Sequence, residues 1–262
     1  MRGCKNMFIE IPFLPGGRVT HVIVDRNAPD EFLKNLEKLR ITPIHSVKVR
    51  VADYAATHPD MQISHVGGNK AVCVPEAYEY YRAALTPLGF EVICGKTDLE
   101  SHYPSNIAYN IARVGKYAAH KKSRTDAEIL RCLEQGGVRI IDVAQGYTKC
   151  AVCVVSENAA ITADGGIAKA FRANGIETLL ITPGGVRLDG VDYGFIGGAC
   201  GLISPSVLAF CGNAEKHRDY KSIKAFASER SVDVVSLCGG ELIDIGSMIP
   251  MKQEVMDWNG SQ

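Results

Sequence analysis

The hydrophobic and polar positions of this chain repeat a pattern in which an amphipathic helix is followed by a short apolar strand. Five segments show it: PDEFLKNLEKLRITPIHSV, PEAYEYYRAALTPLGFEVIC, SRTDAEILRCLEQGGVRIIDV, DGGIAKAFRANGIETLLIT and DYKSIKAFASERSVDVVSL. The residues that open the closing strands are Ile41, Phe90, Val138, Ile176 and Val232. Their mean spacing is about 48 residues, and self-similarity at a fixed period indicates a repeated structural unit.

Two more strand patterns precede each helix. The nearer one occupies residues 22–24, 71–74, 115–118, 159–162 and 207–211, and the farther one starts near residues 61, 107, 151, 199 and 243. The last copy of the farther strand has no helix after it, and the first unit has no copy of its own. We therefore predict a five-bladed α/β propeller of pseudo-fivefold ββαβ units. The C-terminal strand completes the first unit, and closure of the ring covers the open strand edges.

The prediction is a single domain over residues 1–262. Its units are residues 1–59 plus 241–251, 60–104, 105–148, 149–196 and 197–240, with a short tail from Lys252. A doubly wound α/β sheet is the alternative, because it also alternates strands and helices. That alternative does not explain a last strand without a helix.

Composition limits the classes of function. The 262 residues carry 29 basic and 29 acidic side chains, which argues against a nucleic-acid binder. The apolar runs are shorter than the roughly 20 residues that span a bilayer, and the first residues lack the apolar stretch of a signal peptide. Nine cysteines, an odd number, favour reduced thiols. We therefore expect a cytoplasmic protein without membrane or nucleic-acid partners.

The one close pair of cysteines does not indicate a redox or metal motif. Cys150 and Cys153 lie in the apolar run CAVCVV, which is typical of a buried strand. Residues three apart in a strand point to opposite faces, so we expect both thiols to pack in the core.

At this point the chain resembles a known fold. Five ββαβ units about a pseudo-fivefold axis resemble the pentein fold of guanidino-group-modifying enzymes and of ribosome anti-association factors. The sequence more specifically resembles an uncharacterised bacterial family of that fold. The segments that carry the resemblance are HPDMQISHVGGNKAVCVP, YPSNIAYN, GYTKCAVCVVSENAAITADGG, DYGFIGGACGLISP and GGELIDIGSMIP.

The resemblance implies a site in a central channel, lined by the start of each unit's first strand. The corresponding residues, which we predict to bind a ligand, are Asp60, Gln62, Asn106, Lys149, Gly197, Gly198 and Asp244. Asp60 takes the place where these enzymes keep a carboxylate for the guanidinium group, and this match favours a guanidino- or amine-bearing ligand. The cysteine and histidine that the enzymes use are missing, because Gly246–Ser247 and Gly197–Gly198 stand in their places.

Three residues remain as candidates for catalysis: Asp60, Lys149 and Cys200. Cys200 is the best remaining thiol, since small residues surround it in GGACGLI. Lys149 needs a partner or a channel in order to stay charged inside an apolar strand. We expect no metal, because His58 and His65 fall at opposite ends of a short strand. We also expect no cofactor, because no phosphate-binding glycine motif is present.

The sequence leaves three functions open. The first is a binder of a small guanidino or amine ligand that lacks the standard Cys/His pair. The second is a non-catalytic interaction protein of the ribosome anti-association kind, and the third is an amidinohydrolase- or amidinotransferase-like enzyme with a relocated nucleophile. The ligand, the reactivity of Cys200 and the oligomeric state stay open.

Overall fold

The predicted helices are all present in a computed structural model, which describes residues 4–256. They are α1 (Asp30–Lys38), α3 (Tyr78–Leu85), α4 (Ala127–Gln135), α6 (Gly165–Ala173) and α7 (Tyr220–Ser228). The closing strands are β3 (Thr42–His45), β6 (Glu91–Cys94), β9 (Arg139–Asp142), β12 (Glu177–Leu180) and β16 (Asp233–Ser236). Each closing strand begins one residue after its predicted opening residue, so the repeat read from the hydrophobic pattern is confirmed.

Within residues 4–256, four sheets share one topology. Their strand orders are β4-β5-β6, β7-β8-β9, β10-β11-β12 and β14-β15-β16. The strands not yet given are β4 (Ile63–Gly67), β5 (Lys70–Cys73), β7 (Ala112–Val114), β8 (Tyr117–His120), β10 (Val152–Ser156), β11 (Ala159–Thr162), β14 (Cys200–Ser204) and β15 (Val207–Phe210). The first two strands of each sheet are antiparallel, and the last two are parallel. A helix joins the parallel strands because a tight turn cannot connect them.

The first sheet contains a strand from the far end of the chain. Its order is β1 (Cys4–Phe8), β18 (Ile249–Met256), β2 (Arg18–Val24) and β3. Because β18 runs antiparallel to both β1 and β2, it holds the two together. The strand continues past the predicted boundary at residue 251, so Lys252 belongs to β18 and not to a tail. Residues 1–3 and 257–262 of the predicted domain lie outside the described residues.

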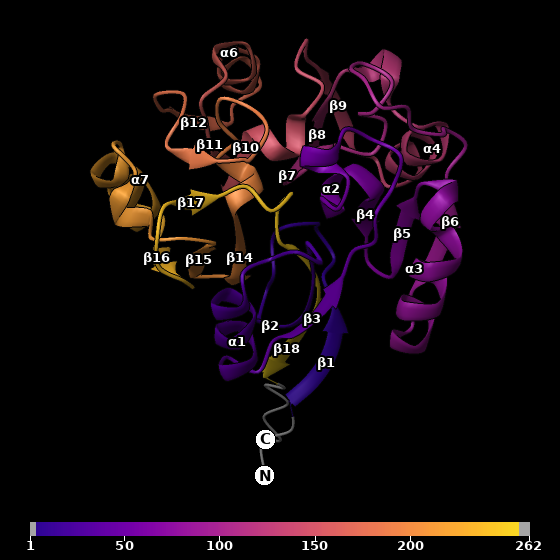
Figure 1. The fold of residues 1–262 in the computed structure, drawn as a ribbon, viewed down its shortest axis with the longest axis horizontal. Helices are drawn as coiled ribbons and strands as arrows, with labels where there is room; N and C mark the ends of the chain where they lie inside the picture. The colour runs from indigo at the N-terminus through magenta and orange to yellow at the C-terminus, as the bar shows by residue number, and fades with distance from the viewer. Residues whose placement is uncertain (1–3, 257–262) are drawn as a thin grey trace, which may run out of the picture.

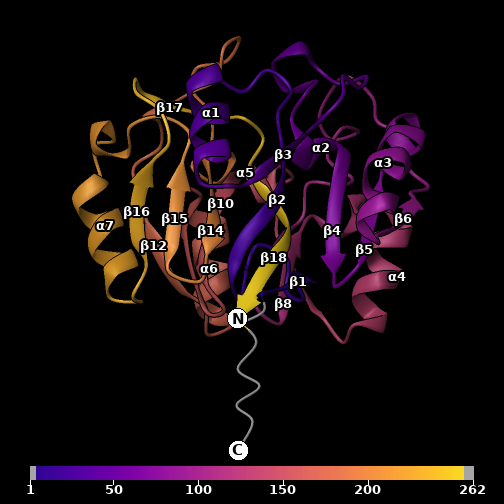
Figure 2. The same cartoon turned by 90° about the horizontal axis from the view of Figure 1, so that it is seen from below.

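The five longer helices, α1, α3, α4, α6 and α7, lie toward the outside of the molecule, whereas the short helix α2 lies nearer its centre (Figure 1). The view from below shows α7 and α3 on opposite sides of the molecule, with β2 and β18 between them (Figure 2). Each helix packs through one apolar side, as Phe32 and Leu36 of α1 illustrate: they are four residues apart, and both are fully buried.

Short helical turns precede three inner strands, where the sequence analysis placed strands. They are α2 (Pro59–Gln62), α5 (Thr148–Ala151) and η5 (Gly197–Ala199). Neighbouring units supply backbone partners to these turns: Asp60 N donates to Gly246 O at 3.2 Å, and Lys149 N donates to Asn110 O at 3.3 Å. Tertiary contacts therefore override the local apolar pattern.

The remaining elements are short. The strand β13 (Val186–Arg187), which was not predicted, pairs in parallel with β17 (Leu242–Ile243). The prediction started the last inner strand near residue 243, whereas the structure has the two-residue β17 there and begins β18 only at Ile249. The other 3₁₀ turns are η1 (Asp53–Ala55), η2 (Pro75–Ala77), η3 (Thr86–Leu88), η4 (Lys122–Arg124) and η6 (Ala214–Lys216). Across the described part of the chain, no helix is both long enough and apolar enough to cross a membrane.

Because two histidines are buried, we expect acid to destabilise the fold. Burial lowers the pKa of His65 and of His120 to about 4 each, whereas a histidine in an unfolded chain titrates near 6.5. The unfolded state therefore binds more protons between these values, and stability falls as the pH falls through that window. We expect the free energy of unfolding to drop by up to about 1.4 kcal/mol per pH unit for each histidine between pH 6 and 5.

Urea denaturation at pH 7, 6 and 5 measures this effect. A His65→Gln variant should lose part of the pH dependence, even if it is less stable at pH 7. A urea midpoint that stays constant from pH 7 to pH 5 would contradict the prediction.

Candidate functional site

Five buried polar side chains meet near the starts of the inner strands. Asp60 belongs to α2, Lys149 and Cys150 belong to α5, and Asp244 and Ser247 lie in the loop between β17 and β18. None of the five is more than 4% exposed. Polar groups removed from water at this level need partners, so their hydrogen bonds determine what the cluster can do.

Asp60 accepts two hydrogen bonds on the same oxygen. Its Oδ2 atom accepts from Ser247 Oγ at 2.7 Å and from Cys150 Sγ at 3.0 Å. Its Oδ1 atom has no hydrogen-bond partner among the described residues, although the side chain is buried. Pro59 at the first position of α2 fixes the backbone that carries this carboxylate.

Lys149 is held by oxygen atoms and by one aromatic ring. Its Nζ atom donates to Ser247 Oγ at 3.0 Å and to Gly197 O at 3.1 Å, and it lies 4.8 Å from the centre of the Phe13 ring. Ser247 therefore bridges the Lys149 ammonium and the Asp60 carboxylate. The backbone of Ser247 has a φ of 75°, an uncommon conformation for a residue other than glycine.

Cys150 lies in this cluster, which corrects the prediction that it packs in the core from a strand. Its thiol donates to Asp60 and accepts from Asn110 Nδ2 at 3.1 Å. Burial raises its pKa well above the ordinary value, and the charges of Asp60 and Asp244 raise it further. The thiol is therefore protonated at neutral pH when no cation is close to it.

Cys200, the thiol that the sequence analysis favoured, opens β14 and is 1% exposed. It lies against Cys153, and the hydrogen bond between the two, together with burial, raises the pKa of Cys153. The geometry thus separates Cys200 from the cluster and places Cys150 within it.

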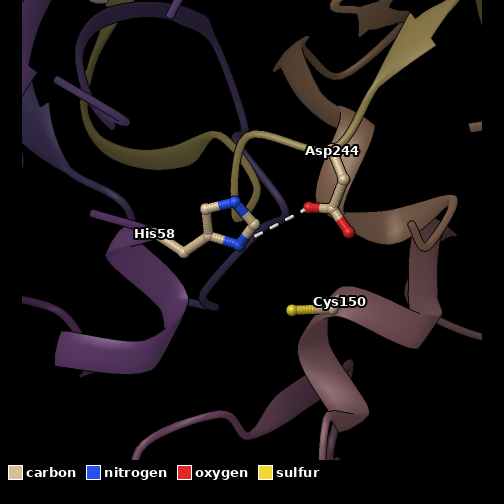
Figure 3. A group of neighbouring side chains, drawn as sticks. All are labelled: His58, Cys150 and Asp244. Carbon is tan, nitrogen blue, oxygen red and sulfur yellow. Dashed lines mark ion pairs between the residues drawn. The ribbon is translucent and has the colours of Figure 1, made fainter. Parts of the chain in front are cut away.

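His58 and Asp244 lie next to Cys150, and the three side chains point into the same space (Figure 3). His58 Nδ1 is 3.8 Å from Asp244 Oδ1, and His58 Nε2 is 3.9 Å from Asp25 Oδ2. Asp244 accepts backbone hydrogen bonds from Phe195 at 2.8 Å and from Gly246 at 2.9 Å. Burial raises the pKa of Asp244, while His58 acts in the opposite direction.

A pocket of about 470 Å³ reaches this group from outside. Its lining includes His58 and four carboxylates, with Arg187 as the one lysine or arginine among the described lining residues. The carboxylates are those of Asp25, Asp53, Asp189 and Asp244. A pocket with this lining favours a positively charged ligand.

The structure brings together most of the residues predicted from the sequence. Asp60, Lys149 and Asp244 contribute side chains, Gly197 contributes a carbonyl oxygen, and Gly198 leaves room for Asp244, because an added Cβ would lie 1.9 Å from Asp244 Oδ1.

Gln62 and Asn106 point elsewhere. Gln62 donates to Val47 O and accepts from Tyr81, and Asn106 bonds with the Tyr147 hydroxyl. In the third unit, Asn110 contacts the cluster in place of Asn106.

The sequence analysis missed His58, Asn110, Cys150 and Ser247. Two of them carried a local signal, since His58 is two residues before Asp60 and Cys150 directly follows Lys149. Ser247 was indicated only by the resemblance, since Gly246–Ser247 stands where the pentein enzymes keep their cysteine. Asn110 carried no signal, because its partners belong to another unit.

The chain matches one family model and several solved structures. A family model described as "Family of unknown function (DUF6873)" matches residues 23–249. The chain belongs to this family. A search of curated proteins found no match.

Solved structures show what the fold of this DUF6873 member resembles. Inosamine-phosphate amidinotransferase from Streptomyces griseus aligns at 10% identity with a TM-score of 0.54, over 93% of this chain and 96% of its own. Agmatine deiminase from C. jejuni, with substrate bound, has 10% identity and a TM-score of 0.52 over 88% and 91%. DDAH from Pseudomonas aeruginosa, in complex with citrulline, has 10% identity and a TM-score of 0.51 over 91% and 100%. The chain therefore has the mixed α/β fold of the pentein enzymes.

Proposed function

We propose that the protein binds a small cationic ligand, with a guanidino or amine group, in the pocket beside His58 and Asp244. The main support for this proposal is the lining of the pocket, which contains four carboxylates and one arginine. A carboxylate can hold a guanidinium group through two parallel, charge-assisted hydrogen bonds. We also infer that the five sheets are the blades of one pseudo-fivefold propeller domain, since four of them repeat a single topology.

The inner carboxylates are already oriented for such a ligand. Asp25 accepts from Asn27 N at 2.7 Å and from Thr57 Oγ1 at 3.0 Å, and Asp244 accepts from two backbone amides. Because these groups do not need to be ordered when the ligand binds, little conformational entropy is lost. The fold adds support, since one protein that shares it is an agmatine deiminase with substrate bound.

The two outer carboxylates of the pocket, Asp53 and Asp189, are exposed to solvent. The side chains of Asp53 and Asp189 are 93% and 86% exposed, and each has a basic neighbour, Lys48 at 3.1 Å and Arg187 at 3.4 Å. Solvent screens charges at this level, so we expect them to attract the ligand rather than to anchor it.

Thermal denaturation with agmatine, arginine and putrescine tests the proposal, with citrulline as the neutral analogue of arginine. At a concentration of about 100 times Kd, a ligand stabilises the native state by about 2.7 kcal/mol, which raises Tm by several degrees in a protein of this size. We expect Asp244→Asn to weaken binding at least about tenfold, because it removes a charge-assisted contact.

Asp233→Asn is the matched control, since Asp233 is an exposed residue of β16 outside the pocket. It should leave the shift unchanged. Equal stabilisation by arginine and citrulline, or no stabilisation by any of the cations, would refute the proposal.

A second candidate is an amidinohydrolase- or amidinotransferase-like enzyme whose nucleophile is Cys150. The supporting observation is that ligand atoms of Cys150, His58 and Asp244 lie within 4.8 Å of one another, which places a thiol beside a histidine base. Because the pKa of Cys150 is raised in the free protein, a bound guanidinium would have to favour the thiolate. Release of urea or ammonia from a bound guanidino compound, abolished by Cys150→Ser and kept by Cys200→Ser, is the expected result.

A further inference from the structure

We propose that His58, Cys150 and Asp244 bind a divalent transition-metal ion, with Zn²⁺ as the best match, at the inner end of the pocket. This metal site shares Asp244 with the proposed cation site, but it does not rest on that proposal, because Cys150, which does not line the pocket, is a metal donor only. The expectation of no metal concerned His58 with His65, whereas His58 and Asp244 come from the two segments of the first predicted unit and Cys150 comes from the fourth.

The donor atoms fit zinc in type and in spacing. An imidazole nitrogen, a thiolate sulfur and a carboxylate oxygen are the ligands that Zn²⁺ prefers, at about 2.0–2.3 Å. Nitrogen and oxygen ligands of a tetrahedral zinc ion therefore lie roughly 3.4 Å apart. His58 Nδ1 and Asp244 Oδ1 are 3.8 Å apart, and all three donor atoms lie within 4.8 Å of one another. Small movements of these side chains would complete the coordination.

His58 provides an independent indication of a ligand. Its side chain is 5% exposed, and its ring nitrogens lie 3.8 Å from Asp244 Oδ1 and 3.9 Å from Asp25 Oδ2, which is longer than a direct hydrogen bond. A cation between the imidazole and Asp244 would give both groups a partner. Asp60 Oδ1, on the carboxylate that accepts from Cys150, is a buried oxygen without a hydrogen-bond partner among the described residues. Asp25 on the Nε2 side corresponds to the outer carboxylate that orients many zinc-bound histidines.

The buried charges also favour a cation. The carboxylates of Asp25, Asp60 and Asp244 are at most 5% exposed, and Lys149 is the one lysine or arginine among the buried residues that the structure describes. Counted at their formal charges, these three carboxylates against one ammonium leave an excess of two negative charges. Because Cys150 loses its proton on binding, a divalent ion would reduce the formal excess from two negative charges to one, and buried charges are commonly paired or bound to metals.

Metal binding removes the thiol proton of Cys150. The S–H bond of Cys150 breaks, a sulfur–metal bond forms, and the proton passes to solvent, for which Asp60 Oδ2 at 3.0 Å is the first acceptor. Asn110 Nδ2, at 3.1 Å, then donates to the thiolate. Since His58 and Asp244 also line the pocket, the fourth coordination position faces it, as in catalytic zinc sites with three protein ligands.

Cobalt substitution tests the site directly. The full-length protein, stripped with a chelator and reduced, is titrated with Co²⁺ and then with Zn²⁺ in competition with a chromophoric chelator. We expect one equivalent of Co²⁺ to produce a thiolate-to-cobalt absorption band. Cys150→Ser should abolish the band and weaken Zn²⁺ binding at least about 100-fold, whereas Cys200→Ser, a matched buried thiol, should retain both.

Further variants keep the result decisive if Cys150→Ser does not fold. Asp25→Asn keeps all three ligands and should weaken Zn²⁺ binding about 10–100-fold through the orientation of His58. Asp189→Asn should leave zinc affinity unchanged while slowing the association of an organic cation, which separates this proposal from the previous one. Binding of less than half an equivalent of Co²⁺, or a thiolate band that persists in a folded Cys150→Ser or His58→Asn variant, would overturn the metal site.

Discussion

Lys149→Met is expected to lower the free energy of unfolding by roughly 3–5 kcal/mol, because it leaves the buried Asp60 carboxylate, which Ser247 bridges to Lys149, without a balancing charge. The variant keeps most of the side-chain volume but removes the ammonium that donates to Ser247 and Gly197. Asp60, which is 1% exposed, then has no cation within its hydrogen-bond network. Urea denaturation followed by circular dichroism measures the loss.

Two further variants separate charge from packing. The double variant Lys149→Met with Asp60→Asn should recover part of the lost stability, because it no longer leaves a carboxylate without a partner. Lys221→Met, at an exposed position of α7, should change stability by less than about 0.5 kcal/mol. If Lys149→Met were as stable as wild type, Lys149 would not be the cation that balances Asp60.

Gly198→Ala should disrupt the site more completely than the loss of any one of its side chains. The added methyl group would lie 1.9 Å from Asp244 Oδ1 and 2.3 Å from its Cγ, so the carboxylate would have to leave its position. Asp244 would lose its backbone hydrogen bonds to Phe195 and Gly246. We expect a loss of roughly 2–3 kcal/mol of stability, together with the loss of both zinc and cationic-ligand binding.

Gly165→Ala provides the matched control for this substitution. A Cβ added at Gly165, the first residue of α6, meets no atom within 4 Å. Gly165→Ala should have a free energy of unfolding equal to that of the wild type or slightly higher, since alanine reduces the conformational freedom of the unfolded chain. Wild-type stability and ligand binding in Gly198→Ala would show that Asp244 can move without consequence, contrary to its proposed roles.

The repeat of helices and strands was predictable because the hydrophobic pattern is local. Ile176 and Val232 marked the starts of two closing strands to within one residue. A half-buried strand and a helix with one buried side each repeat their apolar residues at a characteristic spacing, which can be recognised in the sequence. The start of the inner strand in the fourth unit was not predictable in this way. The run from Cys150 to Val155 is apolar throughout, and only contacts with Asn110 show that its first residues form a helical turn.

The site was predictable only in part, for a related reason. Lys149 and Asp244 stood out because charged residues interrupt apolar segments, and that signal is local, whereas Asp60 was predicted from the resemblance to the pentein enzymes. Cys150 looked like an ordinary core residue, since a buried cysteine shows its role only through its neighbours. The neighbours are residues 58, 60 and 244, whose separation along the chain has no characteristic spacing.

The position of β18 between β1 and β2 sets an order for the folding of the nascent chain. Strand β2 cannot gain its antiparallel neighbour, and β1 cannot join the sheet, until residues 249–256 have left the ribosome. The four sheets in the middle of the chain draw on contiguous segments and can form earlier. The loop that carries Asp244 and Ser247 lies directly before β18, so the site is assembled at the same late step. A ribosome stalled before residue 249 would therefore hold a chain with four of its sheets and without the cluster of buried polar side chains around Asp244.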